Sequence, residues 1–230
     1  MIGRAGDEPN EEVPGPAWIN PQAGPPLSRD AVLADYRAQP QSATNRMLSL
    51  QKLVAQQLVA HGLTMGDFVL GRTVPGMRRA KHWDVTYSFR KRVHLAISCG
   101  SIASGPGDSL SDLVGETMGA CIDAHQFDPG IVLGCLVVDE RMGGTQNSGA
   151  VDTSGFPTLG QQLASLSGRR SLQDAPELFE AATLLRVDFA SRPIGVECYP
   201  GTLGWDEFFE RLVDQVKDRN PTLRNRLDAI

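Results

Sequence analysis

The sequence predicts an α/β domain, in which strands and helices follow one another along the chain. Residues 83–89 and 93–99 alternate apolar with polar side chains, which is the period of a strand with one buried face. Residues 110–122 carry apolar side chains at three- and four-residue intervals, as an amphipathic helix does. The apolar run 131–138 is typical of a strand buried on both faces.

Length and composition predict one folded domain with an N-terminal arm. The chain has 230 residues, of which 41% are hydrophobic and 21% charged, values close to those of soluble globular proteins. Residues 1–29 contain six prolines and several glycines and acids, so we predict a flexible arm there and a single domain over 30–230. A net charge of -5 excludes a chain that coats nucleic acid by overall charge, so DNA contact would need a local basic patch.

The cysteines and the apolar segments bear on redox state and location. Cys99, Cys121, Cys135 and Cys198 are too widely spaced for a zinc knuckle or a redox pair, and three of them lie in apolar stretches, which predicts buried, reduced thiols. The N-terminus lacks the apolar core of a signal peptide, and the run Ile131–Val138 is too short to cross a bilayer. We therefore expect a cytoplasmic protein without a membrane partner.

Two further elements precede the long helix. Apolar residues recur at helical spacing after Ser42, and Gly62 is a plausible stop, which predicts a helix over 42–63. Arg90, Lys91 and Arg92 separate the two alternating segments and are predicted to connect them as a hairpin.

The remaining segments are two loops and two helices. Residues 101–109 are rich in Gly, Ser and Pro and predict a loop, and the Gly-, Ser- and Asn-rich stretch 141–155 predicts a loop that is mobile or contacts a partner. Pro176 is expected to open a helix to about Leu185. Another amphipathic helix is expected over 205–217.

Several segments between about Leu53 and Asp123 are similar to one known family. Val74-Pro75-Gly76-Met77-Arg78-Arg79-Ala80-Lys81-His82-Trp83-Asp84-Val85 contains a proline-glycine turn, basic residues and a Lys-x-Trp-Asp run. Residues 95–101, 104–109 and 115–123 continue the likeness. These segments resemble the XhoI-type restriction endonucleases. The resemblance implies a restriction-endonuclease-like core, in which a mixed central sheet is flanked by the helices at 42–63 and 110–126.

The resemblance also implies a reduced catalytic motif. In the PD-(D/E)XK motif of such enzymes, an aspartate and a second carboxylate bind Mg²⁺, and a lysine positions the attacking water. Asp84 matches the aspartate, but Ser98 and Gly100 stand where the glutamate and the lysine are expected. Two of the three chemical groups are therefore absent from their usual positions.

A rearranged active site is the alternative. Some relatives resemble this chain in having serine at the strand position and a carboxylate on the following helix, where Glu116 is the candidate here. Asp84 and Glu116 would then be the metal ligands. Glu116 lies on the side of its helix away from the apolar stripe, so it is either solvated or directed into a cleft. His94 is expected to share a strand face with Ser98 and Gly100 and could replace the lost lysine, as could Lys81 or Lys91.

The strongest basic concentration in this acidic chain flanks the strand pair of the motif. It has two reasonable interpretations, phosphate contact with DNA or an ordinary solvated face. The candidate DNA-binding residues are Arg78, Arg79, Lys81, Arg90, Lys91 and Arg92.

The function expected from these residues is binding of duplex DNA without cleavage, by a pseudoenzyme derived from a restriction endonuclease and acting in a phage-defence or counter-defence setting. This protein would need no cofactor. One alternative is a Mg²⁺-dependent endonuclease using Asp84 and Glu116, and another is a protein-interaction module, which the charge of -5 and the proline-rich arm would suit. The family acts on palindromic sites as two-fold dimers, so a homodimer is expected by analogy.

Overall fold

A computed structural model describes residues 17–38, 46–102, 108–139, 155–189 and 194–229. Within these ranges seven strands form one sheet, whose order in space is the order in the chain. The strands are β1 (Ala17–Ile19), β2 (Asp67–Val74), β3 (Lys81–Phe89), β4 (Arg92–Ile102), β5 (Val132–Asp139), β6 (Ala181–Asp188) and β7 (Gly195–Cys198). The described helices are α1 (Arg29–Ala38), α2 (Arg46–Ala60), α3 (Asp108–Phe127), α4 (Gly155–Ser165), α5 (Trp205–Arg219) and α6 (Pro221–Leu227).

The sheet is mixed, which confirms the predicted α/β class. Strands β1 to β4 form an antiparallel meander, β4, β5 and β6 are parallel, and β7 returns antiparallel to β6. Parallel neighbours require a crossover connection, and α3 provides it between β4 and β5.

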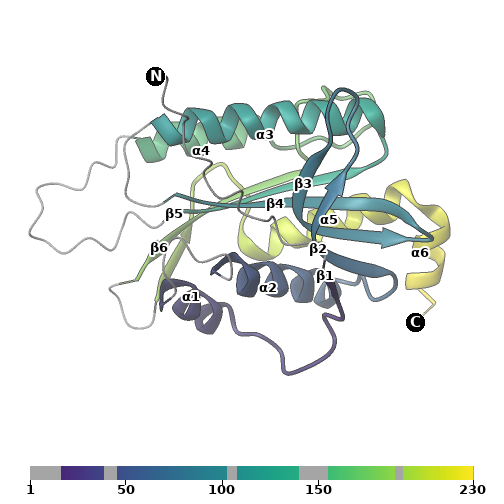
Figure 1. Cartoon of the computed structure of the whole chain (residues 1–230), viewed down its shortest axis with the longest axis horizontal. Helices are drawn as coiled ribbons and strands as arrows, with labels where there is room; N and C mark the ends of the chain where they lie inside the picture. The colour runs from purple at the N-terminus through teal and green to yellow at the C-terminus, as the bar shows by residue number, and fades with distance from the viewer. Residues whose placement is uncertain (1–16, 39–45, 103–107, 140–154, 190–193, 230) are drawn as a thin grey trace, which may run out of the picture.

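Helices cover both faces of the sheet and bury two apolar clusters. Figure 1 shows α3 and α4 along one face and α1 and α2 on the other. The α1, α2, α5 and α6 side chains pack on one cluster of sheet residues and those of α3 and α4 on the other. Sheet residues of the first cluster include Phe68, Leu70, Val85, Tyr87, Leu95, Ile97 and Leu136, and those of the second include Val74, Trp83, Ala96, Leu133, Cys135 and Val137.

The elements with a clear hydrophobic period are confirmed. The two alternating segments form β3 and β4, the apolar run forms β5, and helices α3 and α5 cover their predicted ranges. In α2, Gly62 has a φ of 113°, and the N–H of Leu63 donates to the carbonyl of Leu58, so the helix ends in a left-handed glycine as expected. The first residues of the predicted helix, 42–45, lie outside the described part of the chain.

Part of the predicted arm has regular structure. Ala17–Ile19 pairs with β2 as an edge strand, and α1 follows with Val32, Leu33 and Tyr36 buried. The N–H of Leu27 also donates to Oε1 of Gln56 at 2.8 Å. Proline content excluded a long central strand here but not a short edge strand, which needs few backbone N–H donors. Residues 1–16 lie outside the described ranges.

The helix predicted at 176–185 is wrong, because β6 begins at Ala181. Residues Ala181–Leu185 are all buried between parallel and antiparallel neighbours. A strand buried on both faces has no polar alternation, so its period does not distinguish it from a helix. Of the predicted loops, Ser101 and Ile102 belong to β4 and α3 begins at Asp108, whereas 103–107 and 140–154 are not described.

The thiol prediction is confirmed. Cys99, Cys121 and Cys135 are buried free cysteines, and Cys198 is a half-buried one. None of the helices in the described ranges combines the length and the apolar character needed to cross a membrane.

Candidate functional site

The structure brings Asp84 into contact with the second half of the motif. Oδ2 of Asp84 accepts a hydrogen bond from the backbone N–H of Cys99 at 2.8 Å, and Oδ1 accepts one from Nε2 of Gln51 at 2.9 Å. Gln51 lies on α2, so the carboxylate is held between β4 and that helix. Sequence reasoning did not find Gln51, because 33 residues separate it from Asp84.

The regular alternation of side chains between the two faces of β3 is interrupted at Asp84. Trp83 packs in the cluster under α3, whereas Val85, two residues on, packs in the cluster under α2. Gly71, which lies opposite Asp84 between two paired positions, has a φ of 64°. A left-handed residue is readily supplied only by glycine. The resulting irregularity lets Asp84 reach Gln51 although both of its neighbours are core residues.

Burial raises the pKa of Asp84 above its ordinary value of 3.8. The hydrogen bonds from Cys99 and Gln51 and the charges of His82 and Lys81 act in the opposite direction but do not cancel the effect of burial. Burial disfavours the ionised form, so the ionised carboxylate costs folding stability. Asparagine at this position would keep its oxygen for the N–H of Cys99, and the side-chain amide of Gln51 can turn its own oxygen toward the new amide nitrogen.

Replacing Asp84 by asparagine should therefore stabilise the protein at pH 7. Because the pKa of Asp84 is raised in the folded state, the protonated acid contributes to folding stability at low pH. The wild type loses this contribution as the pH rises through the folded-state pKa. The Tm of D84N should exceed that of the wild type at pH 7, and the difference should shrink toward pH 4. Asp214→Asn, at an exposed position on α5, is the control. A gain that does not depend on pH would contradict the assignment.

The described residues do not fit a Mg²⁺ site of the kind that the motif implies. Each oxygen of Asp84 already accepts an N–H hydrogen bond, and position 98 on β4 offers a serine hydroxyl instead of a second acid. Within the described residues no group of three or more His, Cys, Asp or Glu side chains is arranged to bind a metal ion. Mg²⁺ is held by hard oxygen ligands, mostly carboxylates. A Mg²⁺ ion bound as the motif implies would therefore lack its second carboxylate at position 98.

Lys81 and Glu116 lie together beside this site. Nζ of Lys81 is 3.9 Å from Oε1 of Glu116 and 5.5 Å from the centre of the Trp83 ring. The Lys81 side chain is only 18% exposed, whereas that of Glu116 is 68% exposed. The sequence predicted that Glu116 is either solvated or directed into a cleft. The structure shows an exposed carboxylate that faces the amine of Lys81. The positive charge of Lys81 also acts on Asp84, where it partly offsets the rise in pKa that burial causes.

His94 does not share a face of β4 with Ser98 and Gly100, although the strand alternation predicted that it would. The β3–β4 register shifts between Tyr87, which pairs with Leu95, and Ser88, which pairs with Val93. His94 is therefore the extra residue of a bulge, and a bulge reverses the facing that simple alternation assigns. Its Nε2–H donates to the carbonyl of Phe89 at 3.3 Å, and the ring lines a pocket beside α6 with Phe89. Burial lowers the pKa of His94.

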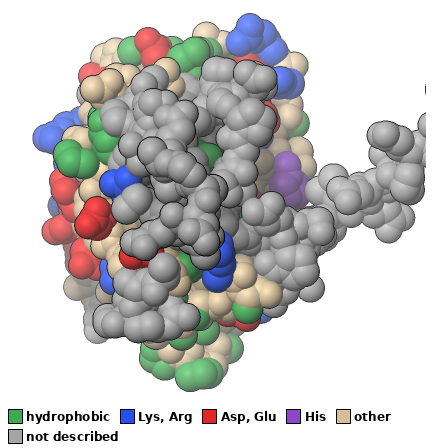
Figure 2. Space-filling view, turned by 90° about the vertical axis from the view of Figure 1, so that its left-hand side faces the viewer, with side chains coloured by type: hydrophobic (Ala, Val, Ile, Leu, Met, Phe, Trp, Pro, Cys, Tyr) green, Lys and Arg blue, Asp and Glu red, His purple; other side chains and the backbone are tan. Residues whose placement is uncertain are grey.

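The six basic candidates do not form one patch. Arg78, Arg79 and Lys81 lie at the start of β3, and Arg90, Lys91 and Arg92 lie at its far end. The nine residues of β3 extend about 30 Å. On the face drawn in Figure 2, the Lys and Arg side chains of the described residues lie among Asp and Glu side chains. Any DNA contact must therefore use one end of the strand or span both.

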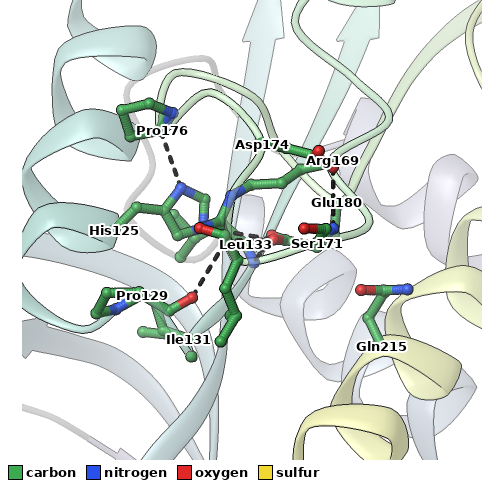
Figure 3. A network of polar contacts seen from close by, with 12 residues as sticks. His125, Pro129, Ile131, Leu133, Arg169, Ser171, Asp174, Pro176, Glu180 and Gln215 are labelled. Carbon is green, nitrogen blue, oxygen red and sulfur yellow. Dashed lines mark hydrogen bonds and ion pairs between the residues drawn. The ribbon is translucent and has the colours of Figure 1, made fainter.

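A buried ionic network was not found from the sequence. Oε1 of Glu180 lies 3.0 Å from Nη1 of Arg169, 2.7 Å from Nη2 of Arg219 and 3.5 Å from Nε2 of His125 (Figure 3). Its Oε2 accepts the N–H of Leu133 at 2.6 Å. These residues are far apart in the chain, and none had a motif around it. The side chains are almost fully buried, which assigns the network to the stability of the fold.

The same network contains a cysteine close to a histidine. Sγ of Cys121 is 3.6 Å from Nδ1 of His125, but Nδ1 also lies 2.9 Å from the carbonyl of Pro176. Because a carbonyl only accepts, Nδ1 carries the hydrogen and cannot take a proton from the thiol. Burial raises the pKa of Cys121 well above its usual range, so this thiol is not activated as a nucleophile.

Comparisons of the chain with protein-family models, with curated proteins and with solved structures found no match, so the site is interpreted from its own geometry.

Proposed function

We propose that this protein binds duplex DNA through a scaffold like that of a restriction endonuclease and does not cut it. The supporting observation is the hydrogen bond from the N–H of Cys99 to Asp84, because it joins the two segments that carry the motif resemblance. They lie on adjacent antiparallel strands, with α2 and α3 on opposite faces of a mixed sheet. This arrangement agrees with what the resemblance implies.

The absence of cleavage follows from the chemistry at positions 98 and 100. Hydrolysis of a phosphodiester needs a Lewis acid that neutralises the developing charge and lowers the pKa of the attacking water. Ser98 and Gly100 supply neither a second carboxylate nor an amine. Asp84 alone is a poor cage for a divalent ion.

The end of β3 beside Asp84 is the proposed DNA-binding surface. The side chains of Arg78 and Arg79 are 70% and 62% exposed, and both pair with the single carboxylate of Asp123, at 2.8 and 3.7 Å. Two guanidinium groups on one acid leave a surplus positive charge. Guanidinium groups in this position can reach backbone phosphates and supply affinity without reading bases.

A gel-shift titration with duplex DNA at 50 and 200 mM salt tests the proposal. Affinity should fall steeply with salt, and Arg78→Ala with Arg79→Ala should weaken binding and lower the salt slope by about one unit per lost phosphate contact. Arg211→Ala, which removes a guanidinium already paired with Glu207 on α5, is the control. Failure to bind any duplex at low salt would overturn the proposal. Light scattering on the same samples measures whether the protein is the homodimer expected by analogy.

A Mg²⁺-dependent endonuclease is the second candidate. The observation that favours it is the contact between Lys81 and Glu116, because the charge of Lys81 also acts on Asp84 and so connects an amine and a second acid with that residue. Plasmid digestion in Mg²⁺ or Mn²⁺ distinguishes the two. If the protein binds duplex DNA without cutting it, the wild type leaves the plasmid intact. Cleavage that Asp84→Ala, Glu116→Gln and Lys81→Met each abolish would establish the second candidate.

A further inference from the structure

The turn between β3 and β4 has an unusual composition for its geometry. It consists of Arg90 and Lys91, whose φ angles are 52° and 66°. A two-residue hairpin turn with positive φ at both positions strongly favours Asn-Gly, because longer side chains are strained there. Two long basic side chains therefore occupy positions that suit them poorly. Strain of this kind is found most often where a side chain has a binding or catalytic role.

A pocket adjoins this turn. It has a volume of about 300 Å³, and its walls are Phe89, Arg90, Arg92 and His94 on one side and residues 219–223 on the other. The second wall is the junction of α5 and α6. Three arginines and no carboxylate line it. This volume is at the lower end of the range for small-molecule sites.

Two of the three arginines of the pocket are held by acids that lie outside it. Nη2 of Arg92 is 2.7 Å from Oδ1 of Asp128, and Arg219 pairs with the buried Glu180. Neither acid lines the pocket. Holding a guanidinium through an acid outside the cavity fixes its position before a ligand binds, which lowers the entropic cost of binding.

Positive charge also gathers at the rim. The guanidinium carbons of Arg90 and Arg226 lie 5.4 and 5.8 Å from the centre of the Phe89 ring. Neither arginine forms an ion pair with a carboxylate of the described residues. The turn and α6 therefore present two arginines, with Lys91 also on the turn, and no acid of the described residues pairs with these cations by direct contact.

We propose that this pocket binds a phosphate group. Guanidinium groups match the oxygens of phosphate in geometry as well as in charge. The pocket is large enough for a phosphate with a small attached group. It lies at the far end of β3 from Asp84, so this inference goes beyond the proposed function and does not depend on it.

The test is to replace Arg90 by asparagine together with Lys91 by glycine. Because Asn-Gly is the preferred sequence for this turn, the R90N/K91G protein should fold and its Tm should rise. Inorganic phosphate, titrated at constant ionic strength into ¹⁵N-labelled wild-type protein, should shift the amide signals of residues 89–94 and 220–223 saturably. In R90N/K91G the affinity for phosphate should fall at least about tenfold. R224Q removes a nearby arginine that is paired with Asp218 and should bind phosphate like the wild type.

Two further arms identify the source of the phosphate. A mononucleotide that shifts the same amides, while a short DNA duplex does not, indicates a small phosphorylated ligand. A duplex that shifts them indicates a backbone phosphate of nucleic acid. Absence of a saturable shift at these amides with all three probes would overturn the proposal, as would unchanged phosphate affinity in R90N/K91G.

Discussion

Replacing Glu180 by alanine is expected to destabilise the protein by about 3–5 kcal/mol, the usual cost of removing one partner from a buried ion pair. The variant leaves Arg169 and Arg219 buried without their acid. It also removes the acceptor of the Leu133 N–H at the start of β5. The network joins α3, α5, β5 and the segment before β6, so its loss weakens the packing of these elements on one another (Figure 3).

Thermal and urea unfolding measure this effect. For a chain of this length the loss corresponds to a fall in Tm of roughly 10 °C. Glu207→Ala is the control, because Glu207 also pairs with an arginine but on the surface of α5, where such pairs contribute little. Glu180→Gln keeps an acceptor for Leu133 and should lose less than the alanine variant. A loss below about 1 kcal/mol in Glu180→Ala would contradict this role.

The same residue predicts acid sensitivity. Burial alone would raise the pKa of Glu180, but contact with His125 and the charge of Arg219 hold the pKa below its ordinary value of 4.5. The stabilising contribution of the carboxylate is therefore complete above about pH 4.5 and is lost as the pH falls through the lower, folded-state pKa. Glu180→Gln should show a shallower loss of stability in this acid range than the wild type.

Replacing Trp83 by alanine should cost about 3–5 kcal/mol, as is typical of a large aromatic side chain lost from a core. Trp83 is 1% exposed and packs in the cluster beneath α3. The ring also lies under the amine of Lys81. Its removal opens a cavity beneath α3 and leaves Lys81 without its aromatic contact, so the proposed DNA binding should weaken in the same variant.

Urea unfolding followed by circular dichroism measures the change without relying on tryptophan emission. Trp18→Ala is the matched control, because Trp18 is 66% exposed and should change stability by less than about 0.5 kcal/mol. Trp83→Phe keeps part of the buried area and should fall between the wild type and alanine. Equal stability of the alanine variants at positions 18 and 83 would exclude the packing role of Trp83.

The sequence predicted elements best where apolar and other side chains alternate. Strands β3 and β4 are buried on both faces, but one face carries small or polar side chains such as Thr86, Ser88 and Ala96, so their large apolar residues still recur at the period of a strand. Strand β6 buries its first five residues without alternation and was mistaken for part of a helix. Other elements were not predicted, since short or weakly periodic segments depend on neighbours supplied by the fold; these are strands β1, β2 and β7 and helices α1, α4 and α6.

The candidate site was predicted in its residue types and only partly in its geometry. Motif resemblance placed Asp84 opposite the Ser98–Gly100 segment, and the hydrogen bond to Cys99 shows that these segments meet. The bulge at His94 could not be foreseen, because one extra residue in a strand leaves no mark on composition. Only the structure shows that the two basic groups lie at opposite ends of β3, because the sequence did not define where this strand begins and ends.

The sequence by itself determined the α/β class, strands β3 to β5, helices α2, α3 and α5, and the lack of a second acid and an amine at positions 98 and 100. Only the tertiary structure decided which distant side chains meet, such as Gln51 with Asp84 and Leu133 with Glu180. The physical reason is that periodicity reports which face of an element is buried, whereas contacts between elements depend on strand register, twist and crossover connections.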